Sequence, residues 1–412
     1  PIVSGIALNA GSAGSEARAR ARRGLAGGLA LRYDGAPMQL RNLACCSFAS
    51  LVMACVTPPR GGASAASGAP GEEPAASPLA LRDCPAPPAL GVRFVGRFDG
   101  CDPSGVRIGW SGTGFVGRFT GTGVAMRHQG PAIEYTVVAD GRVVDKVVTM
   151  PGQGTFPLVV GLPAGEHTIE VYRRGEASFG AATIQGVEVT DGALLPPPGA
   201  RARGLEIVGD SITCGYGNEG TSTDCHFSAA TEDHYRSYGA VLGRIFDADV
   251  STVAWSGRGV VVNYAGGPGP TLPELYPAAV PTDGPSRWQG DQAPQAVVIN
   301  LGTNDYSTDA DPPDERFVAA YEALLSTIRA RYPEAYLLAT NGPMLGGADL
   351  ERARRNIRAA VTRRQQAGDT RVAAHELVTP NTAPGCDWHP SLATHAAMAD
   401  ELARVVAPAV GW

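Results

Sequence analysis

One serine stands where its hydroxyl could act as a nucleophile. Residues 205–208 read Leu-Glu-Ile-Val, and Gly209-Asp210-Ser211 follows directly. A short apolar run of this kind is typical of a strand buried in a parallel sheet. Ser211 would then lie at the carboxyl end of that strand, where open α/β sheets place their ligands. Such a hydroxyl attacks a carbonyl when a base is within reach, although Asp and Ser also cap many helices.

Three further stretches supply the partners that this chemistry needs. Gly257 follows residues 249–254, and Asn304 follows residues 296–301 within Gly302-Thr303-Asn304-Asp305. Near the C-terminus, Asp387 and His389 place a carboxylate and an imidazole close together. A nucleophile, main-chain and amide donors, a base and an acid form the inventory of acyl transfer. Each residue alone has a structural alternative, and the agreement of four stretches favours catalysis.

The elements that must position these residues follow from hydrophobic periodicity. Residues 201–412 alternate apolar strand candidates with amphipathic segments. The expected strands are 205–208, 249–254, 296–301, 336–340 and 371–374, and the expected helices are 235–246, 314–332 and 350–366. This alternation predicts an α/β domain with a parallel sheet flanked by helices, and it gathers the four stretches at one sheet edge.

Residues 88–200 have a different pattern. They carry short alternating segments separated by turns, including a hairpin turn at Asp140-Gly141, with no helical segment between them. We therefore expect an all-β sandwich or jelly-roll domain. Its aromatic residues are candidates for a sugar-stacking face or for core packing: Trp110, Phe115 and Tyr135. Residues 196–199, Pro-Pro-Pro-Gly, form a stiff linker to the second domain.

The four stretches, in this order, resemble the sequence blocks of the SGNH (GDSL-like) hydrolases over roughly residues 204–392. The longer strings at 209–220, 256–259 and 299–305 are similar to carbohydrate esterase family 2. This resemblance implies a jelly-roll domain ahead of the hydrolase domain. It also implies a serine esterase that removes acetyl groups from acetylated polysaccharides such as xylan and glucomannan, with no cofactor and no metal.

The resemblance assigns a role to each site residue. Ser211 is the expected nucleophile and His389 its base, while the N–H groups of Ser211 and Gly257 and the Asn304 side chain form the oxyanion hole. Asp387 is expected to orient His389, although a backbone carbonyl takes this role in some members of the family. The candidates for substrate binding are Trp255, Arg258, Trp288 and Trp388, with core packing as the equal alternative for each tryptophan. Arg258 and Glu232 are polar candidates for the cleft rim, with solvated surface as the alternative for both.

The N-terminal region reads as a leader. Residues 1–37 look like upstream sequence that is not native, with Met38 as the true start, and residues 38–55 have the layout of a signal peptide. The end of that segment resembles the lipobox of bacterial lipoproteins, with Cys55 as the lipidated residue. Residues 56–87 form a tether rich in Pro, Ala, Gly and Ser. We expect export to the cell surface or outer membrane, or an extracellular or periplasmic protein without lipid.

Composition narrows the partners. The 412 residues are 44% hydrophobic and 18% charged with a net charge of −6, which describes a globular protein without a basic surface for nucleic acid. We expect a monomer that contacts membrane only through Cys55. Export permits disulfides. We expect Cys84 to pair with Cys101, whereas the sequence does not decide among Cys214, Cys225 and Cys386, whose spacing matches no metal signature.

Three other functions stay open from the sequence. A lipid-directed esterase or thioesterase on the same scaffold would prefer long acyl chains. A carbohydrate-binding lipoprotein with a decayed esterase site would bind without hydrolysis. A structural surface protein would need only the leader and the tether, and the four intact stretches argue against it.

Overall fold

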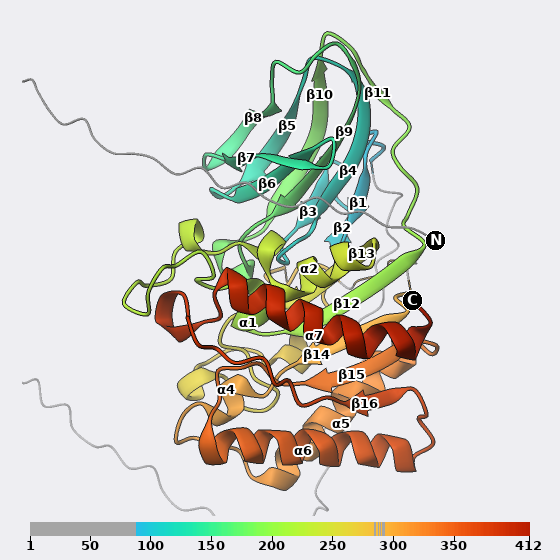
Figure 1. The fold of residues 1–412 in the computed structure, drawn as a ribbon. Helices are drawn as coiled ribbons and strands as arrows, with labels where there is room; N and C mark the ends of the chain where they lie inside the picture. Colours follow the sequence, from blue (N-terminus) through green and yellow to red (C-terminus); the bar gives the residue numbers. More distant parts are fainter. Residues whose placement is uncertain (1–87, 284–285, 287, 289, 291–292) are drawn as a thin grey trace, which may run out of the picture. The chain divides into compact units, whose positions relative to one another are not determined.

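The structure, a computed structural model, describes residues 88–412 apart from 284–285, 287, 289 and 291–292 (Figure 1). The expected upstream segment, signal peptide and tether, with Cys55 and Cys84, lie outside the described residues. Within the part of the chain that the structure describes, no helix is both long enough and apolar enough to span a bilayer.

Two antiparallel sheets form the first fold and confirm the predicted β-sandwich. One has the order β1-β4-β9-β6-β7 with β11 beside β4, and the other has the order β2-β3-β10-β5-β8. The strands are β1 (Arg93–Val95), β2 (Phe98–Asp99), β3 (Val106–Ile108), β4 (Gly114–Gly121), β5 (Gly123–Gly130), β6 (Glu134–Ala139), β7 (Arg142–Val148), β8 (Gly152–Val159), β9 (Gly165–Arg173), β10 (Ala182–Thr190) and β11 (Ala193–Leu195).

The sandwich buries its aromatic side chains instead of presenting them. Phe115 and Tyr135 pack in the apolar cluster between the two sheets, where each is 1% exposed. Alternate side chains of each strand enter this cluster, as the pleat requires. Of the two readings that the sequence left open for these rings, core packing is the one that the structure adopts.

The second fold is a parallel five-stranded sheet and confirms the predicted α/β domain. Its order is β13-β12-β14-β15-β16, and every neighbouring pair is parallel. The strands are β12 (Arg203–Gly209), β13 (Ala248–Ala254), β14 (Ala296–Asn300), β15 (Tyr336–Thr340) and β16 (Val372–Ala374). The helices are α1 (Ser211–Cys214), α2 (Tyr238–Ile245), α3 (Leu272–Leu275), α4 (Thr303–Tyr306), α5 (Asp314–Arg331), α6 (Gly347–Gln366) and α7 (Leu392–Val410), with short 3-10 turns η1 (Ala177–Phe179), η2 (Ala229–Thr231), η3 (His234–Arg236), η4 (Tyr264–Gly266) and η5 (Cys386–Trp388).

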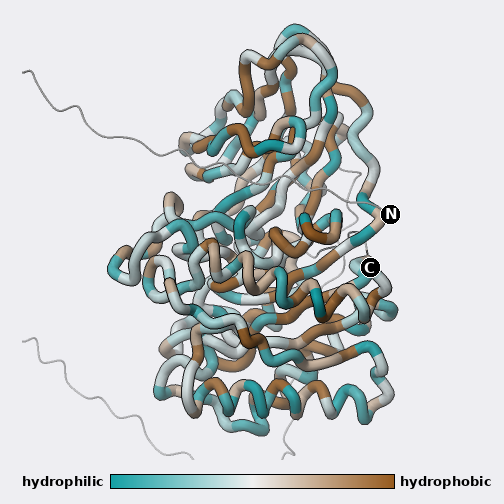
Figure 2. Tube along the Cα trace, viewed as in Figure 1, coloured by the Kyte–Doolittle hydropathy of each residue, from teal (hydrophilic) through white to brown (hydrophobic). Residues whose placement is uncertain are grey.

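Helices cover both faces of this sheet. Along β12, Ile207 joins the apolar cluster with α2 and α7, while the adjacent Val208 joins the cluster with α5 and α6. Figure 1 shows α6 and α7 on opposite sides of the sheet, and Figure 2 shows hydrophobic strands between them. This two-sided burial explains the nearly continuous apolar runs of the strands.

The strand order creates the place where a site can form. The chain runs from β12 outward to β13 and then returns across β12 to β14, so the connections leave the sheet in opposite directions at β12 and β14. In open α/β sheets, ligands bind at such a switch point, outside the carboxyl ends of the strands. Ser211 follows β12 and Asn304 follows β14.

The two folds share a buried interface. Trp110 of the sandwich fold is fully buried in the cluster that also contains Val208, and its indole N–H donates to the Ala278 carbonyl at 3.2 Å. Arg97 forms an ion pair with Glu206 of β12 at 2.9 Å, and both side chains are almost completely buried. Breaking a buried pair of this kind costs about 3–5 kcal/mol. The sandwich is therefore part of the core that supports the sheet.

Candidate active site

The strand exit after β12 presents Ser211 at the carboxyl edge of the sheet. Gly209 ends the strand, and a Cβ there would lie 1.9 Å from the Thr213 hydroxyl oxygen, so only glycine fits. Asp210 caps α1 by accepting from the Ile212 N–H at 3.1 Å. Ser211 occupies the first position of that helix, where an N–H group has no acceptor within the helix. Asp210 therefore caps the helix, and the Ser211 hydroxyl is left to face the site.

Ser211 and His389 meet across the sheet edge. Ser211 Oγ lies 2.8 Å from His389 Nε2, although the two residues are far apart in the sequence. On its other side, the His389 ring places Nδ1 3.0 Å from the main-chain carbonyl oxygen of Asp387. Because a carbonyl oxygen only accepts, Nδ1 carries the hydrogen and Nε2 has the lone pair that accepts from Ser211. This is the tautomer that a general base for Ser211 needs.

The Asp387 carboxylate does not orient His389, and that expectation is corrected. Its oxygens accept from the Tyr216 hydroxyl at 2.9 Å and the Phe227 N–H at 3.0 Å, and Oδ1 contacts His226 Nδ1 at 2.9 Å. The cause is the backbone of η5: Asp387 has φ 49° and Trp388 has φ 61°. Two consecutive left-handed residues turn the Asp387 carbonyl toward the imidazole and its side chain away.

A disulfide holds this strained turn. Cys386, directly before Asp387, is bonded to Cys225 with a Cα–Cα distance of 4.7 Å. Cys214, the third cysteine of the undecided set, is buried and not in a disulfide. Cys101 is disulfide-bonded, and its expected partner Cys84 lies outside the described residues. The Cys225–Cys386 bond therefore links the turn η5, directly before His389, to residues 226–227, which contact the Asp387 carboxylate.

The expected oxyanion donors converge on the same cavity. Asn304, in α4, donates from Nδ2 to the Arg258 carbonyl at 3.0 Å and to Asp210 Oδ2 at a longer 3.3 Å. These contacts fix its amide beside the serine. Gly257 has φ 77°, a conformation that L side chains rarely adopt, and it lines the cavity together with Ser211. The Asn304 amide and the Gly257 main chain thus line the same cavity as Ser211, where a negative charge would develop.

Asp305 anchors the loop that carries Gly257. Its carboxylate accepts from three successive N–H groups, those of Val260, Val261 and Val262, at 2.9, 2.7 and 3.0 Å. Burial raises the pKa of Asp305, while these hydrogen bonds act in the opposite direction. Asp305, the last residue of the stretch 302–305, therefore positions the loop that follows Gly257.

Burial also sets the protonation of the base. Desolvation lowers the pKa of His389 to about 4, although the Asp387 carbonyl acts in the opposite direction. Neutral imidazole is therefore the dominant form near pH 7 and stays so well below it. Asp210 behaves in the opposite way, since burial, with a smaller contribution from Asp305, raises its pKa to about 7.

A cavity of about 540 Å³ contains the site. Among the expected substrate-binding residues, Trp388 lines it and is 64% exposed. Of the described residues that line this cavity, none is Trp255, Arg258 or Trp288. The Trp255 ring packs on the apolar core below the Arg258 guanidinium, which lies 4.8 Å from the ring centroid. Trp288 packs edge-on against Phe98 of the sandwich, and the substrate-binding roles of these three residues stay predictions.

Two features of the site escaped the sequence. The Tyr216 ring stacks on the His389 imidazole with centroids 4.0 Å apart. The Phe227 ring stacks on Tyr216 in turn, with centroids 4.2 Å apart. Tyr216 stands in the Gly215-Tyr216-Gly217 string after the nucleophile, which is the signal that could have pointed to it. Glu232, expected on the rim, is instead fully buried.

Comparison with known proteins gives the same picture for both folds. The family model described as "Carbohydrate esterase 2 N-terminal" matches residues 94–198, and "GDSL-like Lipase/Acylhydrolase family" matches residues 207–404. The structure of a family two carbohydrate esterase from Clostridium thermocellum in complex with cellohexaose is similar with a TM-score of 0.75. It is 38% identical, and the match covers 78% of this chain and 99% of that chain.

Two curated relatives extend the comparison. "Cellulase/esterase CelE" of Acetivibrio thermocellus is 38% identical over 327 residues, which are 78% of this chain. This chain spans only 40% of the length of CelE. "Acetylxylan esterase / glucomannan deacetylase" of Cellvibrio japonicus is 28% identical over 261 residues, covering 60% of this chain and 69% of the relative.

Proposed function

The chain belongs to carbohydrate esterase family 2, and we propose that it is a serine esterase that removes O-acetyl groups from a polysaccharide such as xylan or glucomannan. The observation that carries this proposal is the contact of Ser211 Oγ with His389 Nε2 at 2.8 Å inside the cavity. Relatives whose names include esterase and deacetylase support the same chemistry.

In the proposed mechanism each group has one task. His389 takes the Ser211 proton at Nε2 as Oγ attacks the acetyl carbonyl, and the Asp387 carbonyl stabilises the ring through Nδ1–H. The Asn304 amide and the N–H groups of Ser211 and Gly257 bind the oxyanion, where one donor contributes about 3 kcal/mol to lowering the barrier.

The acyl-enzyme then divides the reaction into two halves. His389 then donates the proton that it took from Ser211 to the sugar oxygen, and the sugar leaves as an alcohol. Water enters, gives a proton to the same nitrogen and attacks the acetyl group on Ser211, and acetate departs as the serine is reprotonated. Every proton moves through one imidazole nitrogen, so the ring needs no rotation.

Trp388 supports a carbohydrate as the alcohol part of the ester. Its indole is an exposed aromatic surface at the edge of the cavity, next to the base. Sugar rings bind to such surfaces through their apolar faces, while an amphipathic indole tolerates both ring and water. One relative was solved with cellohexaose, and another is named for acetylxylan and glucomannan.

We also propose that the protein is exported and held at the cell surface by a lipid on Cys55, and that it acts as a monomer. The lipobox-like end of residues 38–55 supports the anchor. The Cys225–Cys386 disulfide supports an oxidising compartment, because structural disulfides are rare in reducing ones. Metabolic labelling with a fatty acid, compared between the natural chain and Cys55→Ser, tests the anchor.

Acetate release tests the activity. The protein is incubated with acetylated xylan, acetylated glucomannan and acetylated pectin, and acetate is measured over time. We expect release from at least one of the first two. A parallel series of nitrophenyl esters should show a preference for acetyl over long acyl chains. A preference for long chains would replace this proposal with a lipid-directed esterase, and binding without hydrolysis would indicate a decayed site.

A further inference from the structure

A carboxylate from the sandwich fold reaches the loop that carries the oxyanion donor. Glu176 lies in the segment between β9 and η1, far outside the region that contains the four catalytic stretches. It is 2% exposed. One of its oxygens, Oε2, accepts from the Ser256 N–H at 2.9 Å, and the other accepts from the Ser178 hydroxyl at 2.6 Å. Ser256 directly precedes Gly257.

Glu176 is itself fixed from several sides. Its N–H donates to Glu232 Oε2 at 3.2 Å, and its carbonyl accepts from the Arg173 guanidinium at 2.6 Å. Arg173 is fully buried and also donates to the Gly175 carbonyl at 2.9 Å. A residue held by this many contacts adopts one position, so its carboxylate can fix the position of the loop that it binds.

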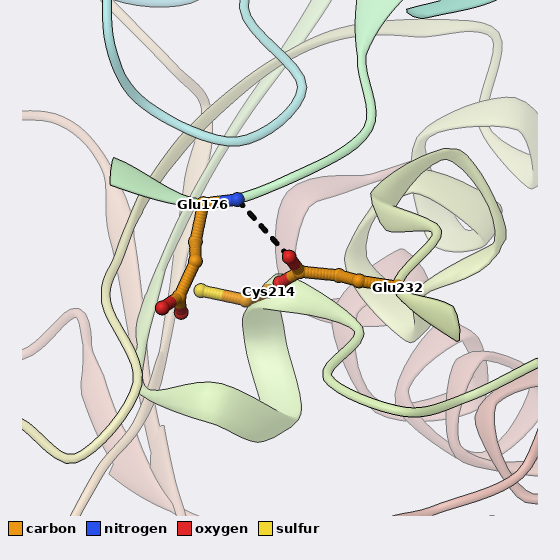
Figure 3. A group of neighbouring side chains, drawn as sticks. All are labelled: Glu176, Cys214 and Glu232. Carbon is orange, nitrogen blue, oxygen red and sulfur yellow. Dashed lines mark hydrogen bonds between the residues drawn. The ribbon is translucent and has the colours of Figure 1, made fainter. Parts of the chain in front are cut away.

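The same cluster has the residue types of a metal site, but its contacts favour another role. Figure 3 shows Glu176, Cys214 and Glu232 as neighbouring side chains. Their possible ligand atoms all lie within 4.8 Å of one another. Both Glu176 oxygens already accept from protein donors. Burial, followed by the charges of the two glutamates, raises the pKa of Cys214, so the thiol is protonated in this cluster.

The Ser256–Gly257 main chain has anchors on both sides of the site. From the hydrolase fold, Asp305 holds the N–H groups of residues 260–262. From the sandwich fold, Glu176 holds the N–H of Ser256. Gly257 lies between these anchors with its unusual φ of 77°. Loss of either anchor would let the peptide that supplies the Gly257 N–H rotate.

We infer that Glu176 is a positioning residue for the oxyanion hole: by holding Ser256, the sandwich fold places the Gly257 N–H toward the acyl oxygen. This inference rests on the proposed esterase function. An oxyanion donor contributes only in the transition state, so its displacement lowers kcat and leaves ground-state binding nearly unchanged.

The test compares three substitutions at Glu176 with one control. Glu176→Ala removes the acceptor, Glu176→Asp keeps the charge but is one methylene too short to reach Ser256, and Glu176→Gln keeps an acceptor oxygen without the charge. The control, Glu188→Ala, removes an exposed carboxylate of the same fold that pairs with Arg127. Hydrolysis of 4-nitrophenyl acetate is measured with kcat and KM separated, and thermal unfolding is followed for every variant.

For Glu176→Ala and Glu176→Asp we expect kcat to fall about tenfold or more, with KM within about twofold of the parent value. Glu176→Gln should recover most of the loss, and Glu188→Ala should match the parent. The affinity of a boronic acid that forms a tetrahedral adduct with Ser211 should weaken together with kcat. If Glu176→Ala does not fold, the Asp and Gln variants decide the question.

Several results would overturn the inference. One is a parent-like kcat in Glu176→Asp or Glu176→Ala, and another is loss of kcat in all three variants with unchanged boronic acid affinity. Loss of parent activity on treatment with EDTA, restored by zinc, would assign the cluster to a metal instead. If the parent protein hydrolyses no acetyl ester, the proposed function fails and takes this inference with it. If the parent is active and Glu176→Ala equals it, the positioning role alone fails.

Discussion

His389 is oriented by the main chain of Asp387 and not by its side chain. The imidazole Nδ1–H donates to the Asp387 carbonyl at 3.0 Å, while the Asp387 carboxylate accepts from Tyr216 and Phe227. A carbonyl is neutral, so the group that fixes the ring tautomer carries no full charge, while the charge of the Asp387 carboxylate still acts to raise the pKa of the ring. The orienting group is therefore independent of the side chain at position 387, provided that the turn keeps its shape.

The first prediction follows from that relationship. Asp387→Asn retains the carbonyl and an acceptor for Tyr216, and asparagine tolerates the left-handed backbone at this position. We expect kcat/KM for 4-nitrophenyl acetate within about tenfold of the parent, against a loss on the order of 10⁴-fold for His389→Ala. Equal losses in the two variants would show that the carboxylate is needed for catalysis.

Removal of the nucleophile should abolish turnover without unfolding the protein. Ser211→Ala is expected to lower kcat on the order of 10⁴-fold or more. Its melting temperature should stay close to the parent value, because the helix cap is supplied by Asp210. Ser326→Ala, an exposed position on α5, is the matched control and should keep full activity. Near-parent turnover by Ser211→Ala would refute the nucleophile assignment.

Asn304 should affect the rate more than binding. Asn304→Ala removes an oxyanion donor and leaves the Arg258 carbonyl without its amide partner. We expect kcat to fall roughly 10²–10³-fold with little change in KM. Asn304→Asp has the same shape but cannot donate when ionised, so its loss should be at least as large. Steady-state kinetics on 4-nitrophenyl acetate decide this, and a change confined to KM would count against the oxyanion role.

The pH dependence follows from the buried base. Burial lowers the pKa of His389 to about 4, below its ordinary value of 6.5. Only the neutral ring accepts the Ser211 proton, so kcat/KM should be flat from neutral pH down to about 5 and fall as pH passes through about 4. Circular dichroism at each pH separates titration from acid unfolding. A midpoint near 6.5 in folded protein would contradict the effect of burial.

The disulfide beside the base should support both stability and rate. The double variant Cys225→Ser/Cys386→Ser frees the turn that holds Asp387 and Trp388 in left-handed conformations. We expect a lower melting temperature, corresponding to about 2–5 kcal/mol, and a reduced kcat. Ser326→Ala, the exposed control on α5, is the comparison for activity. Unchanged kcat in the double variant would mean that the turn holds its shape unaided.

Much of the α/β fold could be predicted because its strands are buried on both faces. Continuous apolar runs such as residues 296–299 leave little ambiguity, and the polar residues that follow them mark one sheet edge. The helix α7 was not predicted, although Ser391 caps its first turn by accepting from the Thr394 N–H. In the sandwich, residues 152–159 contain Pro157 and two glycines, which read as turn signals and hide strand β8 from the sequence.

The residue types of the site could be predicted from the sequence, but the orientation of their side chains and carbonyl groups could not. Sequence places Asp387 near His389 but does not show that two successive residues adopt positive φ, which decides whether carbonyl or carboxylate faces the ring. Nor does it show whether a tryptophan after a strand turns inward, as Trp255 does on the apolar core. Glu176 has no sequence signal at all, because its partner Ser256 belongs to another fold.

The burial of Trp110 beneath the parallel sheet has a consequence for how this protein can change over evolutionary time. A gene fusion that kept the catalytic half and exchanged its neighbour would leave an indole-shaped hole and strip Glu206 of the guanidinium it is paired with. Exchange of either half alone should therefore destabilise the protein, whereas substitutions on the exposed surface around Trp388 leave this interface intact.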